Sequence, residues 1–269
     1  MKYLLFILLL ATSFATRAQD APTRFDRTHG EFNALLHKHV RWSVAGTTRQ
    51  VDYAGLLADR ALLRRYLGSL TSVSSDEFAT WPAADRQAFL INADNAATID
   101  VVLARYPERR SSKELGGRFS SPWDQSFVVI LGKSRSLDAI EHGLLRGAED
   151  YRDPRIQFAL NCASIGCPAL RPEAYAGGRL HAQLDNQTRR FLRDASSNHD
   201  NARSGVLRVS QICNWDSDDW VRHAGGVHAL LARYPVELGL NATAMGRWQS
   251  GQITLAYGEY DWTLNRSHP

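Results

Sequence analysis

The sequence predicts a mostly helical α+β fold, in which a single domain carries a small antiparallel sheet. Three observations support this class: long segments with apolar residues at helical spacing, a few short β-rich runs, and no linker or internal repeat. The length of 269 residues and the apolar content of 44% are enough for one large core. A papain-like arrangement is one form that this class can take.

The first 18 residues indicate an export signal. Lys2 supplies positive charge, residues 4–11 form an unbroken apolar run, and Thr16 and Ala18 place small residues at the two positions that a signal peptidase reads. The run is too short to span a membrane, and the abrupt change of composition at Gln19 argues against a buried N-terminal helix. We therefore expect a periplasmic or secreted protein without membrane association after cleavage, with a flexible segment over 19–30 and one globular domain over 31–269.

Apolar periodicity places the helices. It predicts them over residues 32–40, 51–70, 83–106, 137–145 and 179–193. Several boundaries carry capping signals: a polar cluster at 74–77, Pro82 near a first turn, Ser136 before the fourth helix and Gly147 after it.

Short β-rich runs place the strands. They predict buried strands over residues 127–131, 156–160, 206–209 and 253–257. Polar residues over 196–204 predict a loop. These assignments give more helix than sheet, in agreement with the predicted class.

The balance of charges indicates which class of partner to expect, and the number of cysteines bears on how they pair in the expected compartment. The 32 Lys and Arg residues exceed the 28 Asp and Glu residues only slightly and are spread along the chain, so we expect no nucleic-acid partner. The three cysteines are Cys162, Cys167 and Cys213. An odd number in an oxidising compartment leaves at least one thiol unpaired, and one pair with one free thiol is the simplest arrangement.

The run 156–168 changes character at Asn161, where apolar residues give way to small polar ones. A strand that ends in such a loop presents side chains and backbone N–H groups to a cleft. Cys162 could act there as a nucleophile, with Asn161 and the next N–H groups stabilising an oxyanion. Alternatively, Cys162 and Cys167 form a disulfide across the loop that contains Gly166. Zinc-ligand spacing is weak, and we expect no metal or cofactor.

A nucleophilic cysteine needs a base, and His142 is the candidate. It lies near the edge of the apolar face of helix 137–145, and Asp138, four residues earlier, can orient its ring. The other histidines lie in polar or terminal segments, where a solvated surface position is the default. A structural role is the competing interpretation for His142 as well.

Two asparagines form a third unusual feature. Asn92 and Asn95 share one face of helix 83–106 among apolar residues, although asparagine is a poor former of helix interiors. They either cap a local break in the helix or hydrogen-bond across to the Asn161 loop.

The chain resembles the family called domain of unknown function 547. The resemblance spans about residues 80–265 and is carried by FLINADNA (89–96), SLDAIEHGLLR (136–146), DPRIQFALNCAS (153–164), GCP (166–168) and YDWTLN (260–265). The family has Trp in place of Leu90, Tyr in place of Asp94, His in place of Gln157 and Phe in place of Cys213. Cys213 is therefore expected to be a small buried hydrophobe, and His142 is the one motif histidine left beside the cysteine loop. The resemblance marks positions without supplying a reaction.

Two functional hypotheses follow. The first, which we favour, is a papain-like thiol-dependent hydrolase or acyltransferase acting on amide or thioester bonds. Its catalytic residues would be Cys162, His142, Asn161 and either Asp138 or Asn92, and its substrate-binding residues would be Asn92, Asn95, Ser164, Cys167 and Arg171. The second is a non-catalytic domain that binds a small molecule or peptide in a cleft shaped by a Cys162–Cys167 disulfide, with Arg171, Glu173 and Tyr175 at its rim. Polar residues at three apolar element ends favour a site, because they are costly to bury unless they meet.

Overall fold

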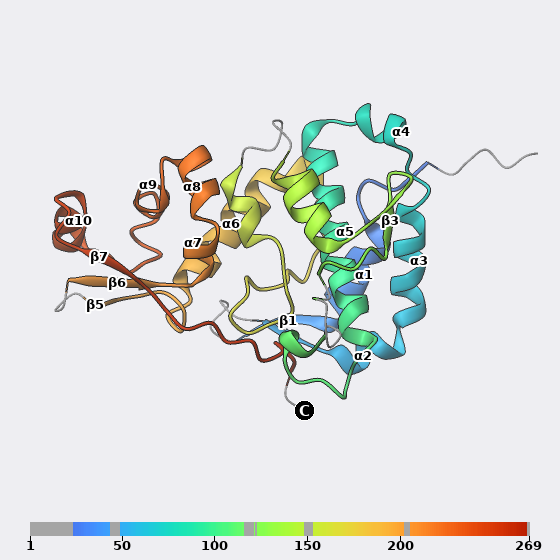
Figure 1. The fold of residues 1–269 in the computed structure, drawn as a ribbon, viewed down its shortest axis with the longest axis horizontal. Coiled ribbons are helices and arrows are strands. Elements are labelled where there is room, and N and C mark those ends of the chain that lie inside the picture. Colours follow the sequence, from blue (N-terminus) through green and yellow to red (C-terminus); the bar gives the residue numbers. More distant parts are fainter. Residues whose placement is uncertain are drawn as a thin grey trace, which may run out of the picture.

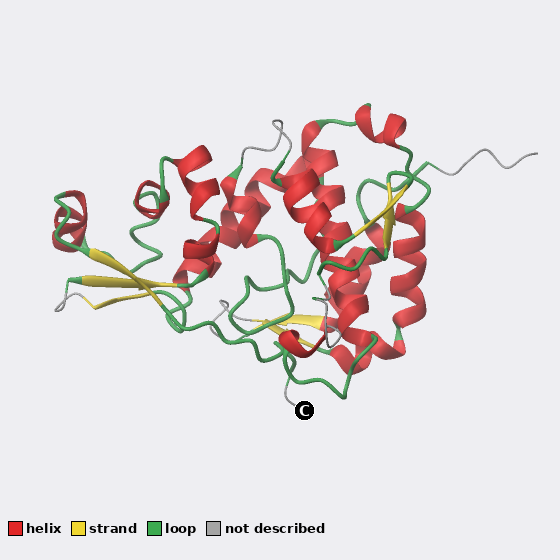
Figure 2. Ribbon diagram, viewed as in Figure 1, coloured by secondary structure: helices red, strands yellow, loops and turns green. Residues whose placement is uncertain are grey.

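The computed structural model describes residues 24–43, 49–115, 121, 123–147, 153–201 and 205–267. The predicted signal segment and residues 19–23 lie outside these ranges. The predicted mostly helical α+β class is confirmed, with small sheets joined to a larger body of helices (Figures 1 and 2). Residues 24–29 pack onto the core, where Phe25 stacks on Trp81 and His29 Nδ1 lies 2.8 Å from Tyr66 Oη.

The N-terminal helices group on the right of Figure 1. They are α1 (Gly30–His39), α2 (Tyr53–Ala58), α3 (Arg60–Leu70), α4 (Ser75–Ala79) and α5 (Ala83–Leu103). Strands β1 (Val40–Trp42) and β2 (Arg49–Val51) form an antiparallel pair. The single helix predicted over 51–70 is wrong, because Val51 lies in β2 and the chain breaks at Asp59. The Asp59 carboxylate binds Lys38 and His39 there.

Helix α5 runs through the centre of this group and is buried on nearly all sides between Gln87 and Ile99. Its polar residues are therefore enclosed by protein rather than by solvent. This burial explains why a polar side chain on α5 must find a partner or face a cavity.

The middle of the chain is made of short elements. A 3-10 turn, η1 (Ser112–Leu115), precedes the antiparallel strands β3 (Val128–Ile130) and β4 (Lys133–Arg135), and a wide helical segment, η2 (Ala139–Leu145), follows them. The strand predicted over 156–160 is wrong: η3 (Pro154–Phe158) is a 3-10 helix whose first turn is capped by the Asp153 side chain. A short apolar run does not distinguish a buried strand from a buried helical turn.

The C-terminal part begins with the turn η4 (Gly177–Arg179) and helix α6 (Leu180–Arg193), and it lies on the left of Figure 1. In its sheet, β6 (Val206–Val209) pairs antiparallel with β5 (His199–Asn201) and parallel with β7 (Thr254–Tyr257). The loop predicted over 196–204 thus contains a strand. The remaining helices are α7 (Ile212–Trp215), α8 (Ser217–Ala224), α9 (Val227–Leu231) and α10 (Ala242–Gln249).

Buried side chains form two clusters, one around α5 and one between α6 and the C-terminal sheet and helices. Residues of η3 join both, since Ile156 belongs to the first cluster and Phe158 to the second. Among the described helices, none is both long enough and apolar enough to span a bilayer.

Candidate functional site

A cavity of about 410 Å³ opens where the two clusters meet. Its walls come from α5, η2, the loop that follows η3, the α7–α8 junction and the C-terminal segment 260–262. The predicted site residues that line it are Asp138, His142, Asn161, Cys162 and Cys167. Segments far apart in the sequence therefore meet at one place, as a functional site requires.

The loop that carries the cysteines is anchored to α5 by Asn95. The Asn95 side chain donates to the Ala159 carbonyl over 3.0 Å and accepts from the Asn161 backbone N–H over 2.9 Å. The Asn161 side chain then donates to the Pro168 carbonyl and accepts from the Ala163 N–H. Of the two explanations for Asn95, the hydrogen bond to the Asn161 loop is the one observed, and both asparagines hold backbone in place.

The same loop is clamped from outside by the C-terminal segment. The Ile165 N–H donates to the Thr263 carbonyl, and the Asn265 N–H donates to the Ala163 carbonyl. Ala163 has a φ of 63°, a left-handed conformation that is costly for a residue other than glycine. Gly166 is required by close approach, since a Cβ there would lie 3.0 Å from the Asp261 nitrogen.

Cys162 and Cys167 are joined by a disulfide, with their Cα atoms 6.0 Å apart. The Cys162 N–H points at Cys167 Sγ, and the Tyr260 hydroxyl lies 2.8 Å from Cys162 Sγ and 2.7 Å from Ser164 Oγ. Ser164 is almost fully buried behind this contact. Cys213 is free and buried, and burial raises the pKa of its thiol to about 12, which makes it a poor nucleophile.

His142 lies at the edge of the cavity with its side chain half exposed, and both ring nitrogens face neighbours on its own helical segment. Arg146 Nη1 donates to His142 Nδ1 over 2.8 Å, so the neutral ring carries its proton on Nε2. That nitrogen lies 3.3 Å from Asp138 Oδ1. Among the described residues, no hydrogen bond joins the imidazole to either sulfur, although all three side chains line one cavity.

The cavity also holds carboxyl groups that the sequence did not point to. Asp94, on α5, is only 4% exposed, lines the cavity, and has no hydrogen bond or ion pair to any residue that the structure describes. Burial, together with the charge of Glu141, raises the pKa of Asp94 well above its usual range. Burial also raises the pKa of Glu141, although Arg146 lies 3.7 Å away.

Asp216 and Asp219 share Arg146 on the other side of the cavity. Arg146 Nη1 lies 3.0 Å from Asp216 Oδ1, and Arg146 Nε binds Asp219 Oδ2. Burial raises the pKa of Asp216 to about 7 against the opposing effect of Arg146. Burial acts in the same direction on Asp219, but hydrogen bonds from Arg146 and Arg222 prevail and lower the pKa of that carboxyl. Asp216 is thus poised to exchange a proton near neutral pH.

Aromatic rings form the remaining wall. Trp215, Tyr260 and Trp262 contact one another with ring centroids 4.5–5.7 Å apart, and all three line the cavity. Trp215 is 49% exposed. Such rings provide apolar contact surface for a bound organic group.

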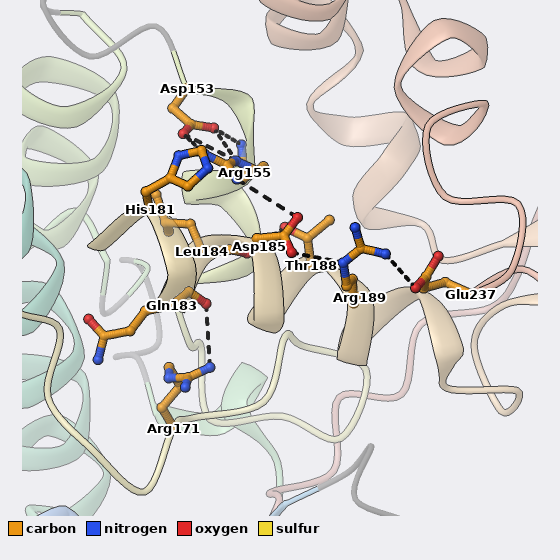
Figure 3. A network of polar contacts seen from close by, with 10 residues as sticks. All are labelled: Asp153, Arg155, Arg171, His181, Gln183, Leu184, Asp185, Thr188, Arg189 and Glu237. Atoms are coloured by element: carbon orange, nitrogen blue, oxygen red, sulfur yellow. Dashed lines mark hydrogen bonds and ion pairs between the residues drawn. The ribbon is translucent and has the colours of Figure 1, made fainter. Parts of the chain in front are cut away.

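Four predicted binding residues do not line this cavity: Asn95 and Ser164, which lie behind it at the cysteine loop, and Asn92 and Arg171, which point elsewhere. Asn92 donates to the Tyr175 carbonyl and accepts from the Tyr175 N–H, which makes it a brace for that segment. Arg171 points to α6, where it donates to the Gln183 carbonyl (Figure 3) and to the Asn186 side chain. Neither side chain lines the cavity among the residues described.

Sequence reasoning found the cysteine loop and His142 but missed Asp94, Glu141, Asp216 and the role of Tyr260. A signal for Asp94 was present, since the resembled family has Tyr at that position, and Tyr260 opened the last resembled segment. Glu141 is next to His142 in the sequence, but only the fold shows that it lines the cavity, and Asp216 precedes α8, which is distant in sequence from the loop.

Comparisons with known proteins give one positive result. The family described as "Protein of unknown function, DUF547" matches residues 78–192, which include the buried stretch of α5, η2 and the cysteine loop. No curated protein and no solved structure matches the chain. In the part of the chain that the structure describes, no group of three or more His, Cys, Asp or Glu side chains is arranged to hold a metal ion.

Proposed function

We propose that this chain, which matches the DUF547 family over residues 78–192, binds a small molecule or peptide in the cavity whose wall contains the Cys162–Cys167 disulfide. The observation that carries the proposal is the position of that disulfide. It lies in the wall of a cavity large enough for a small organic ligand, beside aromatic rings and carboxyl groups.

The contacts around the disulfide support binding more than covalent catalysis. Sulfur atoms bonded to each other offer no thiolate. The imidazole of His142 accepts from Arg146 at one nitrogen and faces Asp138 with the other, so neither nitrogen is free to take a proton from a thiol. Asn161 likewise has its side chain occupied within the loop.

Thiol counting tests the proposal. We expect iodoacetamide to leave the native, unreduced protein unlabelled, and to add one label, at Cys213, after unfolding in urea. Cys213→Ser is the matched control and should take no label in either state. Rapid labelling of Cys162 in the native protein would show that the Cys162–Cys167 disulfide is absent, and it would support a nucleophilic role for Cys162.

A second candidate is the thiol-dependent hydrolase or acyltransferase, which one observation favours: His142 and both sulfurs line the same cavity. An external dithiol would first reduce the disulfide and become oxidised itself. The Cys162 thiolate would then attack a thioester or amide carbonyl and expel a thiol or amine, with the proton passing through His142. A papain-like triad would need Asp138 to orient that ring.

Assaying the reduced protein with S-phenyl thioacetate tests this candidate. It requires thiophenol release that appears only after reduction, is lost in Cys162→Ser, and falls in His142→Ala. Equal release by native protein and Cys162→Ser would exclude it.

We also propose that the protein is exported, because a lasting disulfide is typical of a periplasmic or secreted protein. The motif over residues 1–18 supports this compartment. Expression in a bacterial host should yield a periplasmic protein whose N-terminus is Gln19. A cytoplasmic protein that retains Met1 would contradict it.

A further inference from the structure

We propose that the ligand carries an organic cation, an ammonium or guanidinium group, which is held by the carboxyl groups of Asp94, Glu141 and Asp216 with its apolar part against the aromatic wall. This inference rests on the proposed binding function of the cavity and names the chemical class of its ligand.

Asp94 provides the first argument. Only 4% of Asp94 is exposed, and it lines the cavity without a hydrogen bond or ion pair to any described residue. A buried carboxyl group without a hydrogen bond costs folding free energy, so its retention needs a reason. A hydrogen-bonding cation in the cavity would be its missing partner.

The charges around Asp94 provide the second argument. Arg146 is already shared by Asp216 and Asp219 on one side, and it reaches Glu141 only at 3.7 Å. The other basic group in the lining, His142, faces Asp138. The carboxyl groups therefore outnumber the cations, and the resulting repulsion is relieved by protonation or by a bound positive charge.

The aromatic wall provides the third argument. Trp215, Tyr260 and Trp262 place π-faces beside the carboxyl groups, and such faces attract cations. Trp262 already binds one cation, since Lys113 Nζ lies 4.5 Å from its ring centroid. Aromatic rings next to carboxyl groups that outnumber the neighbouring cations favour an organic amine over a hydrated inorganic ion.

Two sources offer this chemistry: a free amine, or the side chain of a Lys or Arg residue in a peptide. Two probes distinguish them, 2-phenylethylamine for the free amine and a capped Ala-Lys-Ala peptide for the side chain. The matched neutral and anionic probes are 2-phenylethanol and 3-phenylpropionate, which keep the ring and change only the charge.

Isothermal titration calorimetry at pH 7.5 measures the affinity of each probe for the full mature chain with its disulfide intact. We expect one molecule of 2-phenylethylamine or of the lysine peptide to bind, at least about tenfold more tightly than 2-phenylethanol, because a desolvated charge pair discriminates strongly. 3-Phenylpropionate should bind most weakly. The probe that binds more tightly, the amine or the peptide, identifies the source.

Asp94→Asn should weaken binding of the cation by about tenfold or more while binding of 2-phenylethanol changes little. Glu141→Gln is a second variant of the same kind, and Asp218→Asn, on the exposed face of α8, is the control that should leave all affinities unchanged. Unchanged circular dichroism and an unchanged thiol count confirm that each variant is folded.

The outcomes separate the inference from the function on which it rests. If 2-phenylethanol or 3-phenylpropionate binds as tightly as the cations, the cation inference is overturned and the binding cavity stands. If Asp94→Asn and Glu141→Gln both bind the amine like the native protein, the inference is overturned too. If no probe binds, the proposed binding function is overturned together with the inference.

Discussion

Replacing Asp216 with Asn should stabilise the protein near neutral pH. The Asp216 side chain is only 13% exposed. Burial raises its pKa from 3.8 to about 7, with Arg146 opposing the shift and Glu141 and Asp219 adding to it. The positive charge of a protonated His142 also opposes the shift. The native fold must therefore hold an acid that ionises much more readily in the unfolded chain.

The magnitude follows from the two pKa values. Below pH 3.8 the group is protonated in both states and costs nothing; as pH rises, the unfolded chain ionises first, and stability falls until the pH passes about 7. The difference between the two pKa values lowers the free energy of unfolding by about 4 kcal/mol at pH 7.5 and by less than half of that at pH 5. Asn resembles the neutral acid, so Asp216→Asn should remove most of this penalty, and we expect a gain of about 2–4 kcal/mol at pH 7.5.

Urea unfolding, followed by tryptophan fluorescence at pH 5 and pH 7.5, measures the effect. The native protein should lose stability between these two pH values more steeply than Asp216→Asn does. Asp218→Asn, exposed on the same helix, should stay within about 0.5 kcal/mol of the native protein. If Asp216→Asn is destabilised at pH 7.5, or shows the native pH dependence, then Arg146 fully stabilises the ionised carboxylate and burial of Asp216 carries no cost.

Three other substitutions test separate parts of the structure. Asn95→Ala should cost about 2–4 kcal/mol in urea unfolding, because it leaves a buried carbonyl and an N–H group without partners, and a loss below about 1 kcal/mol would show that the loop holds itself. The double change Cys162→Ser with Cys167→Ser should cost about 2 kcal/mol from loop entropy alone, and an unchanged urea midpoint would show that the staple is dispensable. Trp215→Ala should weaken binding of 2-phenylethylamine about threefold to tenfold with little loss of stability, since the ring is half exposed; unaltered affinity would remove this ring from the binding wall.

The helices were the predictable part of the fold, because amphipathic periodicity survives wherever one face meets solvent. α6 begins and ends close to the predicted residues for this reason. The predicted strand at 156–160 failed because that apolar run is buried on all sides, where periodicity carries no information about backbone type. The Asp153-Pro154 pair was the local signal for a helical turn there.

The site was predictable to the extent that its residues share one segment. The cysteine loop and the Asp138–His142 pair were found because close spacing makes their contact almost unavoidable. Asp94 and Asp216 were not, because in the sequence an aspartate that the fold will bury looks like any surface acid. Their importance depends on burial, which arises only when α5 and the α7–α8 junction face the same cavity.

A crystal structure of the protein grown with saturating 2-phenylethylamine would show whether the cavity holds an organic cation. We expect an amine in the cavity, its ammonium within hydrogen-bond distance of the Asp94 carboxylate and its ring against Trp215, Tyr260 or Trp262, beside an intact Cys162–Cys167 bond. An amine bound elsewhere, or an open pair of thiols beside an empty cavity, would contradict this expectation.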